Sequence, residues 1–93
     1  MKKEKITFSE FLENDYAVIH CHTREEFDYL MDKLIARTPY NMYYNPNKGI
    51  EAVWYDYGAE GCVQNNGVGA DYHFYSQLDN YTIYEFEELD FNK

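Results

Sequence analysis

The clearest pattern along the chain is an apolar stripe with helical spacing between residues 23 and 37. Five apolar residues occupy the i, i+3, i+4, i+7 and i+8 positions of one face: Phe27, Leu30, Met31, Leu34 and Ile35. Thr23 and Glu26 precede most of the stripe at the spacing of a capping box. Pro39 ends the pattern, because proline disfavours an α conformation in the residue before it. The pattern predicts one amphipathic helix over about residues 23–37.

A shorter helix signal lies near the start of the chain. Thr7 and Glu10 have the capping-box spacing, and Phe8, Phe11 and Leu12 form the apolar side of a short turn. Asn14 and Asp15 end this pattern. We expect a short helix that folds onto the domain as a lid.

Strand signals occupy most of the remaining sequence. Residues 16–21 (YAVIHC) are rich in β-favouring side chains and predict a central strand. Later windows at 51–57, 61–64, 71–75 and 81–87 also read as strands, because they are aromatic or β-branched and are bounded by Gly, Asn or Ser. Asn66-Gly67 predicts a hairpin turn between the second and third of these. Residues 40–49 predict a loop or a ragged edge strand.

These elements predict the α+β fold class. The expected order is a short N-terminal helix and then β-α-β-β-β(-β), with an antiparallel sheet packed on the helix at about 23–37. One helix covers one face of such a sheet. The opposite face then needs aromatic side chains, the opening helix or a second chain to cover it.

Length and composition favour one folded domain over residues 1–93. Hydrophobic residues make up 45% of the chain and aromatic residues 19%, which is enough apolar surface to offset chain entropy. The sequence shows neither a run long enough to span a membrane nor the apolar region of a signal peptide. With Cys21 and Cys62 as its cysteines, the chain is expected to be cytoplasmic and to hold two free thiols.

Charge adds information about partners. The formal net charge is −9, and from residue 38 to residue 92 the sequence has one basic residue, Lys48. The same stretch carries nine acids: Glu51, Asp56, Glu60, Asp71, Asp79, Glu85, Glu87, Glu88 and Asp90. Such a field repels a phosphate backbone, so direct binding of nucleic acid is disfavoured. It attracts a protein with a basic surface, which makes the chain a candidate nucleic-acid mimic.

Aromatic content indicates where that partner would bind. Eleven Tyr, six Phe and one Trp exceed what a core of this size buries, and Tyr suits surfaces that are partly dry and partly hydrogen-bonded. Tyrosines among carboxylates predict a recognition face for Lys and Arg through charge pairing and cation–π contact. The alternative is that the tyrosines only cover a solvent-facing sheet. The predicted partner-binding residues are Trp54, Tyr55, Asp56, Tyr57, Glu60, Asp71, Tyr72, Tyr84, Glu85, Glu87 and Glu88.

Catalytic and metal patterns are weak by comparison. His20, Cys21 and His22 with Cys62 and His73 come nearest to a metal set, but neighbours in a strand point to opposite faces. At most His20 and His22 share a side, and neither Cys-x-x-Cys nor His-Glu-x-x-His spacing supports them. We therefore expect no metal and no cofactor.

Enzymatic chemistry is also not expected. Either cysteine could be paired with a histidine, Cys21 with His22 or Cys62 with His73, but nothing in the sequence lowers a thiol pKa. The glycines at 67 and 69 lack the Gly-Lys-Ser/Thr of a phosphate loop. The acids at 85–90 lack the glycine-containing loop that organises calcium.

The layout resembles small acidic proteins encoded by phages and prophages of Firmicutes. The resemblance rests on residues 6–12 (ITFSEFL), 16–21, 23–34 and 81–89, the last with the pattern Tyr-x-Ile-x-Glu-Phe-Glu-Glu. It implies a setting in which small acidic proteins inhibit host defence, including anti-CRISPR proteins that occupy nucleic-acid-binding surfaces of Cas effectors. The resemblance brings no catalytic residues.

Three functions follow as hypotheses. The leading one is a phage-encoded inhibitor of a bacterial defence complex, an anti-CRISPR protein that blocks a basic site. The second is a sponge for a cyclic nucleotide signal, in which Trp54 or a tyrosine stacks on the base and Lys48 with its Asn-rich loop binds phosphate. The third is a phage structural or regulatory protein that self-associates, as a homodimer or larger, through an uncovered sheet face.

Overall fold

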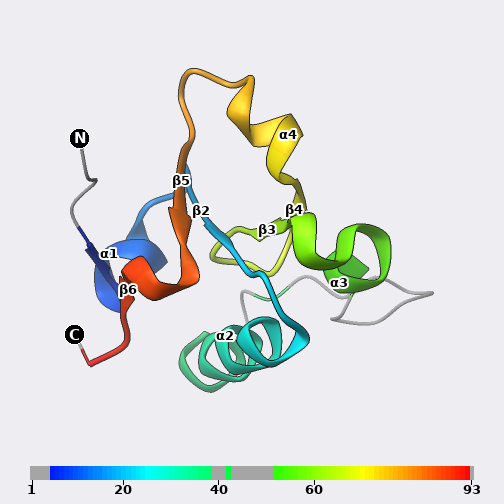
Figure 1. Cartoon of the computed structure of the whole chain (residues 1–93). Coiled ribbons are helices and arrows are strands. Elements are labelled where there is room, and N and C mark those ends of the chain that lie inside the picture. The colour runs from blue at the N-terminus through cyan, green and yellow to red at the C-terminus, as the bar shows by residue number, and fades with distance from the viewer. Residues whose placement is uncertain (1–4, 39–41, 43–51, 93) are drawn as a thin grey trace.

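The fold is α+β, and the computed structural model describes residues 5–38, 42 and 52–92 (Figure 1). Helical segments alternate with short strands along the chain. The helices are α1 (Phe8–Glu13), α2 (Arg24–Arg37), α3 (Ala52–Tyr57) and α4 (Tyr72–Ser76), with the 3₁₀ turns η2 (Gly58–Glu60) and η3 (Phe86–Glu88). The strands are β1 (Ile6–Thr7), β2 (Ala17–His20), β3 (Gly61–Val63), β4 (Gly69–Asp71), β5 (Thr82–Glu85) and β6 (Leu89–Asp90).

The central sheet has four strands in the order β4-β3-β2-β5. β3 is antiparallel to β2 and to β4, whereas β5 is parallel to β2, with His20 opposite Glu85. A second, parallel pair joins β1 to β6. The expectation of an antiparallel sheet is therefore wrong at β5. A parallel pair requires a long crossover, and the whole segment from α2 to α4 supplies it here.

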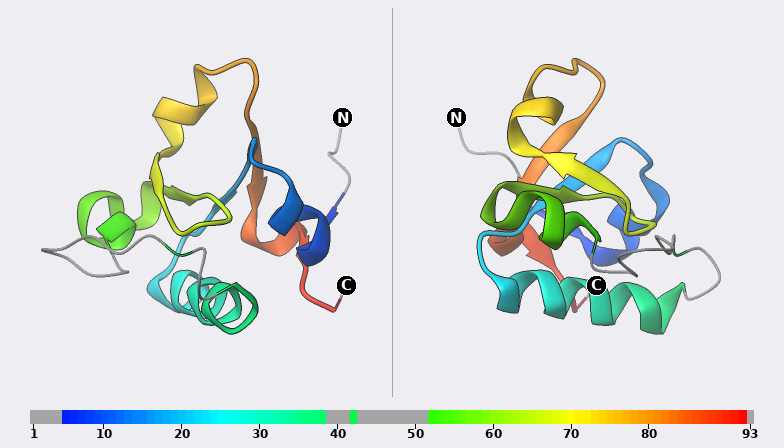
Figure 2. Two further views of the ribbon diagram at one scale, coloured as in Figure 1. Left: turned by 180° about the vertical axis from the view of Figure 1, so that it is seen from behind. Right: turned by 90° about the vertical axis from the view of Figure 1, so that its right-hand side faces the viewer.

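The two faces of the sheet bury different clusters. Ala17 and Ile19 face the larger core, which also holds Phe11, Leu30 and Leu34, and all five are fully buried. Val18 faces the other way and packs with Cys62 of β3 and with Tyr75 of α4. Figures 1 and 2 show α2 and α4 on opposite sides of the sheet. Within the described residues, α2 thus packs toward one face of the sheet and the shorter α4 toward the other.

The long helix is confirmed as α2. Thr23 is its N-cap, and the Thr23 side chain accepts a hydrogen bond from the backbone of Glu26 at 3.1 Å. The Glu26 carboxylate reaches one residue further back than a capping box requires and accepts the His22 backbone N–H at 2.7 Å. The helix N-terminus is thereby tied to the residues that follow β2.

The opening helix is confirmed as α1, with both capping-box bonds between Thr7 and Glu10 at 3.0 Å. The prediction that this helix folds onto the domain is confirmed, and its apolar side is buried in the core. Phe8 and Phe11 are 2% and 0% exposed, so α1 is part of the main core. Fully burying one Phe side chain stabilises a fold by roughly 1.5–3 kcal/mol.

The predicted hairpin is confirmed between β3 and β4. The backbone N–H of Gly67 donates to Gln64 at 3.0 Å, and Gly67 has a φ of 83°. This combination is a tight turn followed by a left-handed residue, which glycine adopts without a steric penalty. The turn also aims the Asn65 amide at α1: it donates to the Leu12 carbonyl at 2.9 Å.

Two predicted strands are helices instead. Residues 52–57 form α3, so the strand predicted at 51–57 is wrong within the described residues. In the window 71–75, Asp71 ends β4 and its side chain accepts the Phe74 backbone N–H at 2.8 Å as the N-cap of α4. The β preference of aromatic residues depends on packing, and here the packing of short helices on the sheet overrides it.

The last predicted strand, 81–87, is confirmed as β5 in its first part, after which the chain turns into η3. The loop predicted at 40–49 lies outside the described residues except for Met42, which is buried. Among the helices of the described ranges, none has both the length and the apolarity that crossing a bilayer requires.

Candidate functional site

Seven of the predicted partner-binding residues lie on four elements in contact with one another, α3, η2, β4 and α4. α3 and α4 pack on either side of β4, and both face the viewer in the right-hand view of Figure 2. Tyr55 is 63% exposed, and Tyr57 and Tyr72 are also exposed. Asp56 and Glu60 are exposed beside them, while Trp54 and Asp71 are half-buried. We call the exposed residues Tyr55, Asp56, Tyr57, Glu60 and Tyr72 the tyrosine face.

Trp54 belongs to the core more than to this face. Its ring packs on Phe27 with the ring centroids 5.9 Å apart, and the Arg24 guanidinium lies 6.0 Å from its ring centroid. Trp54 also packs against the large buried cluster. It therefore joins α3 to α2.

We expect Trp54→Ala to lower the free energy of unfolding by about 2 kcal/mol, because it removes half-buried aromatic packing. Its neighbour Tyr55 provides the control. Tyr55→Ala makes the same kind of truncation in the same helix at an exposed position, so its effect is expected to stay within about 0.5 kcal/mol. Urea denaturation of both variants measures the difference, and equal losses would contradict this assignment of Trp54.

The other four predicted residues lie on β5 and η3. Tyr84 is half-buried against the large core, and Glu87 is exposed. Glu88 accepts the Glu85 backbone N–H at 2.7 Å. Glu85 turns its carboxylate toward two histidines rather than toward solvent.

Both groups belong to a stretch of uniform charge. Residues 52–92 contain eight acids and neither Lys nor Arg, a formal charge of −8. In this range the exposed acids are Asp56, Glu60, Asp79 and Glu87. The potential over α3, α4 and η3 is therefore negative, and cations are attracted to it.

A cleft of about 520 Å³ lies where α2 begins, on the side of η3. Aromatic rings form part of its wall. The centroid of the Tyr29 ring lies 4.9 Å from that of Phe91 and 6.0 Å from that of Phe86, and both ring pairs meet edge to face. Thr23, Glu25 and Glu26 complete the lining. Rings beside carboxylates are the surroundings that a Lys or Arg side chain prefers.

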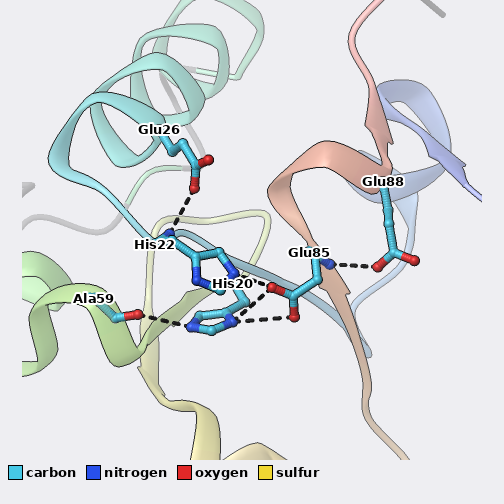
Figure 3. A network of polar contacts seen from close by, with 6 residues as sticks. All are labelled: His20, His22, Glu26, Ala59, Glu85 and Glu88. Atoms are coloured by element: carbon cyan, nitrogen blue, oxygen red, sulfur yellow. Dashed lines mark hydrogen bonds and ion pairs between the residues drawn. The ribbon is translucent and has the colours of Figure 1, made fainter.

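A polar cluster joins β2, η2 and β5 (Figure 3). The His20 Nδ1 lies 3.0 Å and 3.3 Å from the two carboxylate oxygens of Glu85. The His20 Nε2 lies 2.9 Å from the carbonyl oxygen of Ala59. His22 bonds through Nε2 to the same Glu85 oxygen as His20, and the two imidazole centroids are 4.1 Å apart.

This cluster is the junction of the two predicted groups. The Tyr72 ring lies 5.0 Å from the ring of His20, so α4 and β5 meet at this one histidine. Partial burial acts to raise the pKa of Glu85, but its hydrogen bonds to His22 and His20 outweigh burial and the pKa is lowered. The bond to Glu85 in turn raises the pKa of His22. The geometry favours a charged carboxylate facing two imidazoles.

Neither cysteine is prepared for nucleophilic chemistry. Burial raises the pKa of Cys62 to about 12, and neighbouring carboxylates, Glu85 among them, add to the effect. Burial also raises the pKa of Cys21. A thiolate is the reactive form, and these surroundings disfavour it.

Comparison of the chain with protein-family models, with curated proteins and with solved structures found no match.

The sequence predicted some of these features and missed others. It indicated that at most His20 and His22 share a side; the structure brings their two rings together, although β2 ends at His20. It did not connect them to Glu85, because only a parallel pairing of β2 with β5 brings that residue alongside. The cleft was missed as well, since Tyr29, Phe86 and Phe91 come from segments that no sequence pattern links.

Proposed function

We propose that this protein inhibits a bacterial defence complex by binding a basic protein surface, and that the target is a CRISPR effector. The observation that carries the proposal is the tyrosine face, within a stretch of 41 residues (52–92) that contains eight acids and neither Lys nor Arg. Exposed tyrosines beside carboxylates match a surface rich in Lys and Arg. Such surfaces normally hold the phosphate backbone of a nucleic acid.

The acidic face favours protein over nucleic acid as the partner. A protein that binds phosphates needs Lys and Arg to release counterions, and residues 52–92 have none to offer. The cyclic-nucleotide alternative relied on Lys48, which lies outside the described residues. Inhibition by occupying a basic groove requires only that the acidic face fit where a nucleic acid would bind.

The cleft gives this interaction a specific anchor. A Lys or Arg side chain of the partner can lie in the cleft against the contacting rings of Tyr29, Phe86 and Phe91 and place its charge near Glu25 and Glu26. Lys33 already lies 5.2 Å from the centroid of the Tyr29 ring, so this ring accommodates a cation on one face. A few such anchoring side chains, Arg among them, contribute a large share of the binding energy at interfaces.

Gel filtration of the full chain with a panel of CRISPR effector proteins, free of guide RNA, tests the proposal. We expect a complex at about 0.1 M salt that weakens strongly toward about 1 M, because salt screens the charges that attract the partner. Guide RNA added beforehand should prevent the complex. Failure to bind any effector at any salt concentration would contradict the CRISPR assignment.

A pair of charge reversals locates the binding surface. Glu60→Lys lies on the tyrosine face and should weaken the complex about tenfold. Asp79→Lys makes the same change of net charge in the exposed turn between α4 and β5, away from that face, and should weaken it by less than about threefold. Equal effects would mean that total charge, rather than this face, determines binding.

A further inference from the structure

We propose that His20, His22 and Glu85 form a binding site for a divalent first-row transition metal ion such as Zn²⁺. The site does not depend on the proposed partner, since its ligands come from the fold itself. One ligand atom from each residue, two imidazole nitrogens and one carboxylate oxygen, lies within 4.8 Å of the others.

The backbone brings these ligands together. His20 and Glu85 are directly opposite each other in the parallel pair of β2 and β5, so their side chains share one face of the sheet. His22 follows two residues after His20 and lies on the same side. Figure 3 shows all three side chains pointing toward one another.

The tautomer of His20 suits a metal ligand. The Ala59 carbonyl can only accept a hydrogen bond, so the His20 Nε2 must carry the proton of that 2.9 Å contact. In the neutral ring, Nδ1 then has a lone pair that faces the two oxygens of Glu85. Lone pairs repel unless a positive charge lies between them, and either a proton or a metal ion supplies it. A backbone carbonyl that holds the far nitrogen is the usual support of a metal-bound histidine.

Further hydrogen bonds fix the other two ligands. The His22 backbone N–H donates to Glu26 at 2.7 Å, and the Glu85 backbone N–H donates to Glu88 at 2.7 Å. These bonds hold the backbone of each ligand residue in place. They also bring the carboxylates of Glu26 and Glu88 toward the cluster, and negative surroundings favour a divalent cation.

The ligand types select the class of metal. Two imidazoles and one carboxylate suit Zn²⁺, Co²⁺, Ni²⁺ or Fe²⁺, whereas Ca²⁺ and Mg²⁺ prefer oxygen ligands throughout. Three protein ligands leave a position for water or for a group from a partner. An ion has access from solvent, because the His22 side chain is 54% exposed while that of His20 is 9% exposed.

Calorimetric titration of the EDTA-treated full chain with Zn²⁺, and visible absorption with Co²⁺, test the site. We expect one ion per chain and a rise in thermal stability that EDTA reverses. His22→Ala should weaken Zn²⁺ binding by at least about 100-fold, since loss of a ligand exceeds the 10- to 100-fold effect of losing a supporting contact. Glu85→Gln should weaken it comparably. Mg²⁺ should not compete.

His73→Ala is the matched control. His73 is the third histidine of the chain and is exposed on α4, outside the cluster, so its removal should leave Zn²⁺ affinity within about threefold. Circular dichroism verifies that the His22→Ala chain, altered at an exposed side chain, is folded. Three results would overturn the proposal: an unaltered chain that does not bind Zn²⁺ saturably, full affinity in both His22→Ala and Glu85→Gln, or an equal loss in His73→Ala.

Discussion

Gly69→Ala is expected to lower the free energy of unfolding by about 3 to 5 kcal/mol, a large part of the 5 to 15 kcal/mol typical of a whole domain. Gly69 opens β4 and pairs with Val63. A Cβ at this position would collide with the carbonyl oxygen of Cys62 and would lie 3.3 Å from Val53. The colliding atom is backbone in the neighbouring strand, so it cannot move without breaking the β3–β4 pairing. Thermal and urea denaturation measure the loss.

Gly67→Ala, in the same hairpin, separates this collision from an ordinary glycine effect. Gly67 has a φ of 83°, and an alanine in this conformation lowers the free energy of unfolding by about 1 to 2 kcal/mol. The nearest atoms to a Cβ there are the methyl ends of Met42 and Met31, at 2.8 Å and 3.2 Å, and flexible side chains can move aside. Gly67→Ala should therefore be the milder of the two. A ranking in the opposite order would mean that backbone conformation, not the close approach of β4 to β3, governs this hairpin.

Elements with a strong local signal were predictable from the sequence. α2 has fourteen residues and an apolar stripe repeated over several turns, and α1 has a capping box, so a local sequence pattern indicates both. α3 and α4 have six and five residues, too few for a helical period to show. Their aromatic residues favour strands in isolation, and packing on the sheet decides otherwise.

The candidate sites likewise contain some features that a local sequence pattern indicates and others that only the fold reveals. The spacing of His20 and His22 is a local pattern, and it indicated that their side chains could share a side. The third member, Glu85, is brought in by a parallel pairing between strands that lie far apart in the sequence, and no short-range pattern encodes such a pairing. The acidic character of residues 52–92 could be read directly, whereas the exposure of Tyr55 and the burial of Trp54 required the fold.

The polar cluster gives the acidic surface a fixed shape. His20 contacts Ala59 of η2, Tyr72 of α4 and Glu85 of β5, so it holds together the elements that carry the tyrosine face and the acids of η3. Preorganised surfaces bind more tightly because less conformational freedom is lost on association. A metal ion at His20, His22 and Glu85 would make this junction more rigid.

Asn65→Asp is expected to lower the free energy of unfolding by about 3 kcal/mol near neutral pH, although it changes a single NH₂ group into oxygen. Asn65 is 7% exposed, and its amide nitrogen donates to the Leu12 carbonyl at 2.9 Å and lies 3.3 Å from the Asp15 carboxylate. An aspartate would direct a negative oxygen at these acceptors. It would also remove the donor that Asn65 gives to the Leu12 carbonyl near the C-terminus of α1.

The pH dependence of this variant has a definite sign, and a neighbouring residue supplies its control. Burial and the nearby carboxylate of Asp15 would raise the folded-state pKa of an aspartate at position 65 above its unfolded value. The stability lost near neutral pH should therefore return as the pH falls through that raised pKa, because the protonated carboxyl can donate again.

Asn66→Asp is the control, because it adds the same charge one residue later. The side-chain oxygen of Asn66 already accepts the Val68 backbone N–H at 3.1 Å, so this variant should change the free energy of unfolding by less than about 0.5 kcal/mol. Urea denaturation near neutral pH and in mild acid measures the free energy of unfolding of both variants. The role of the Asn65 amide in holding α1 to the hairpin would be contradicted by equal losses in the two variants. A loss in Asn65→Asp that grows in acid would contradict it as well.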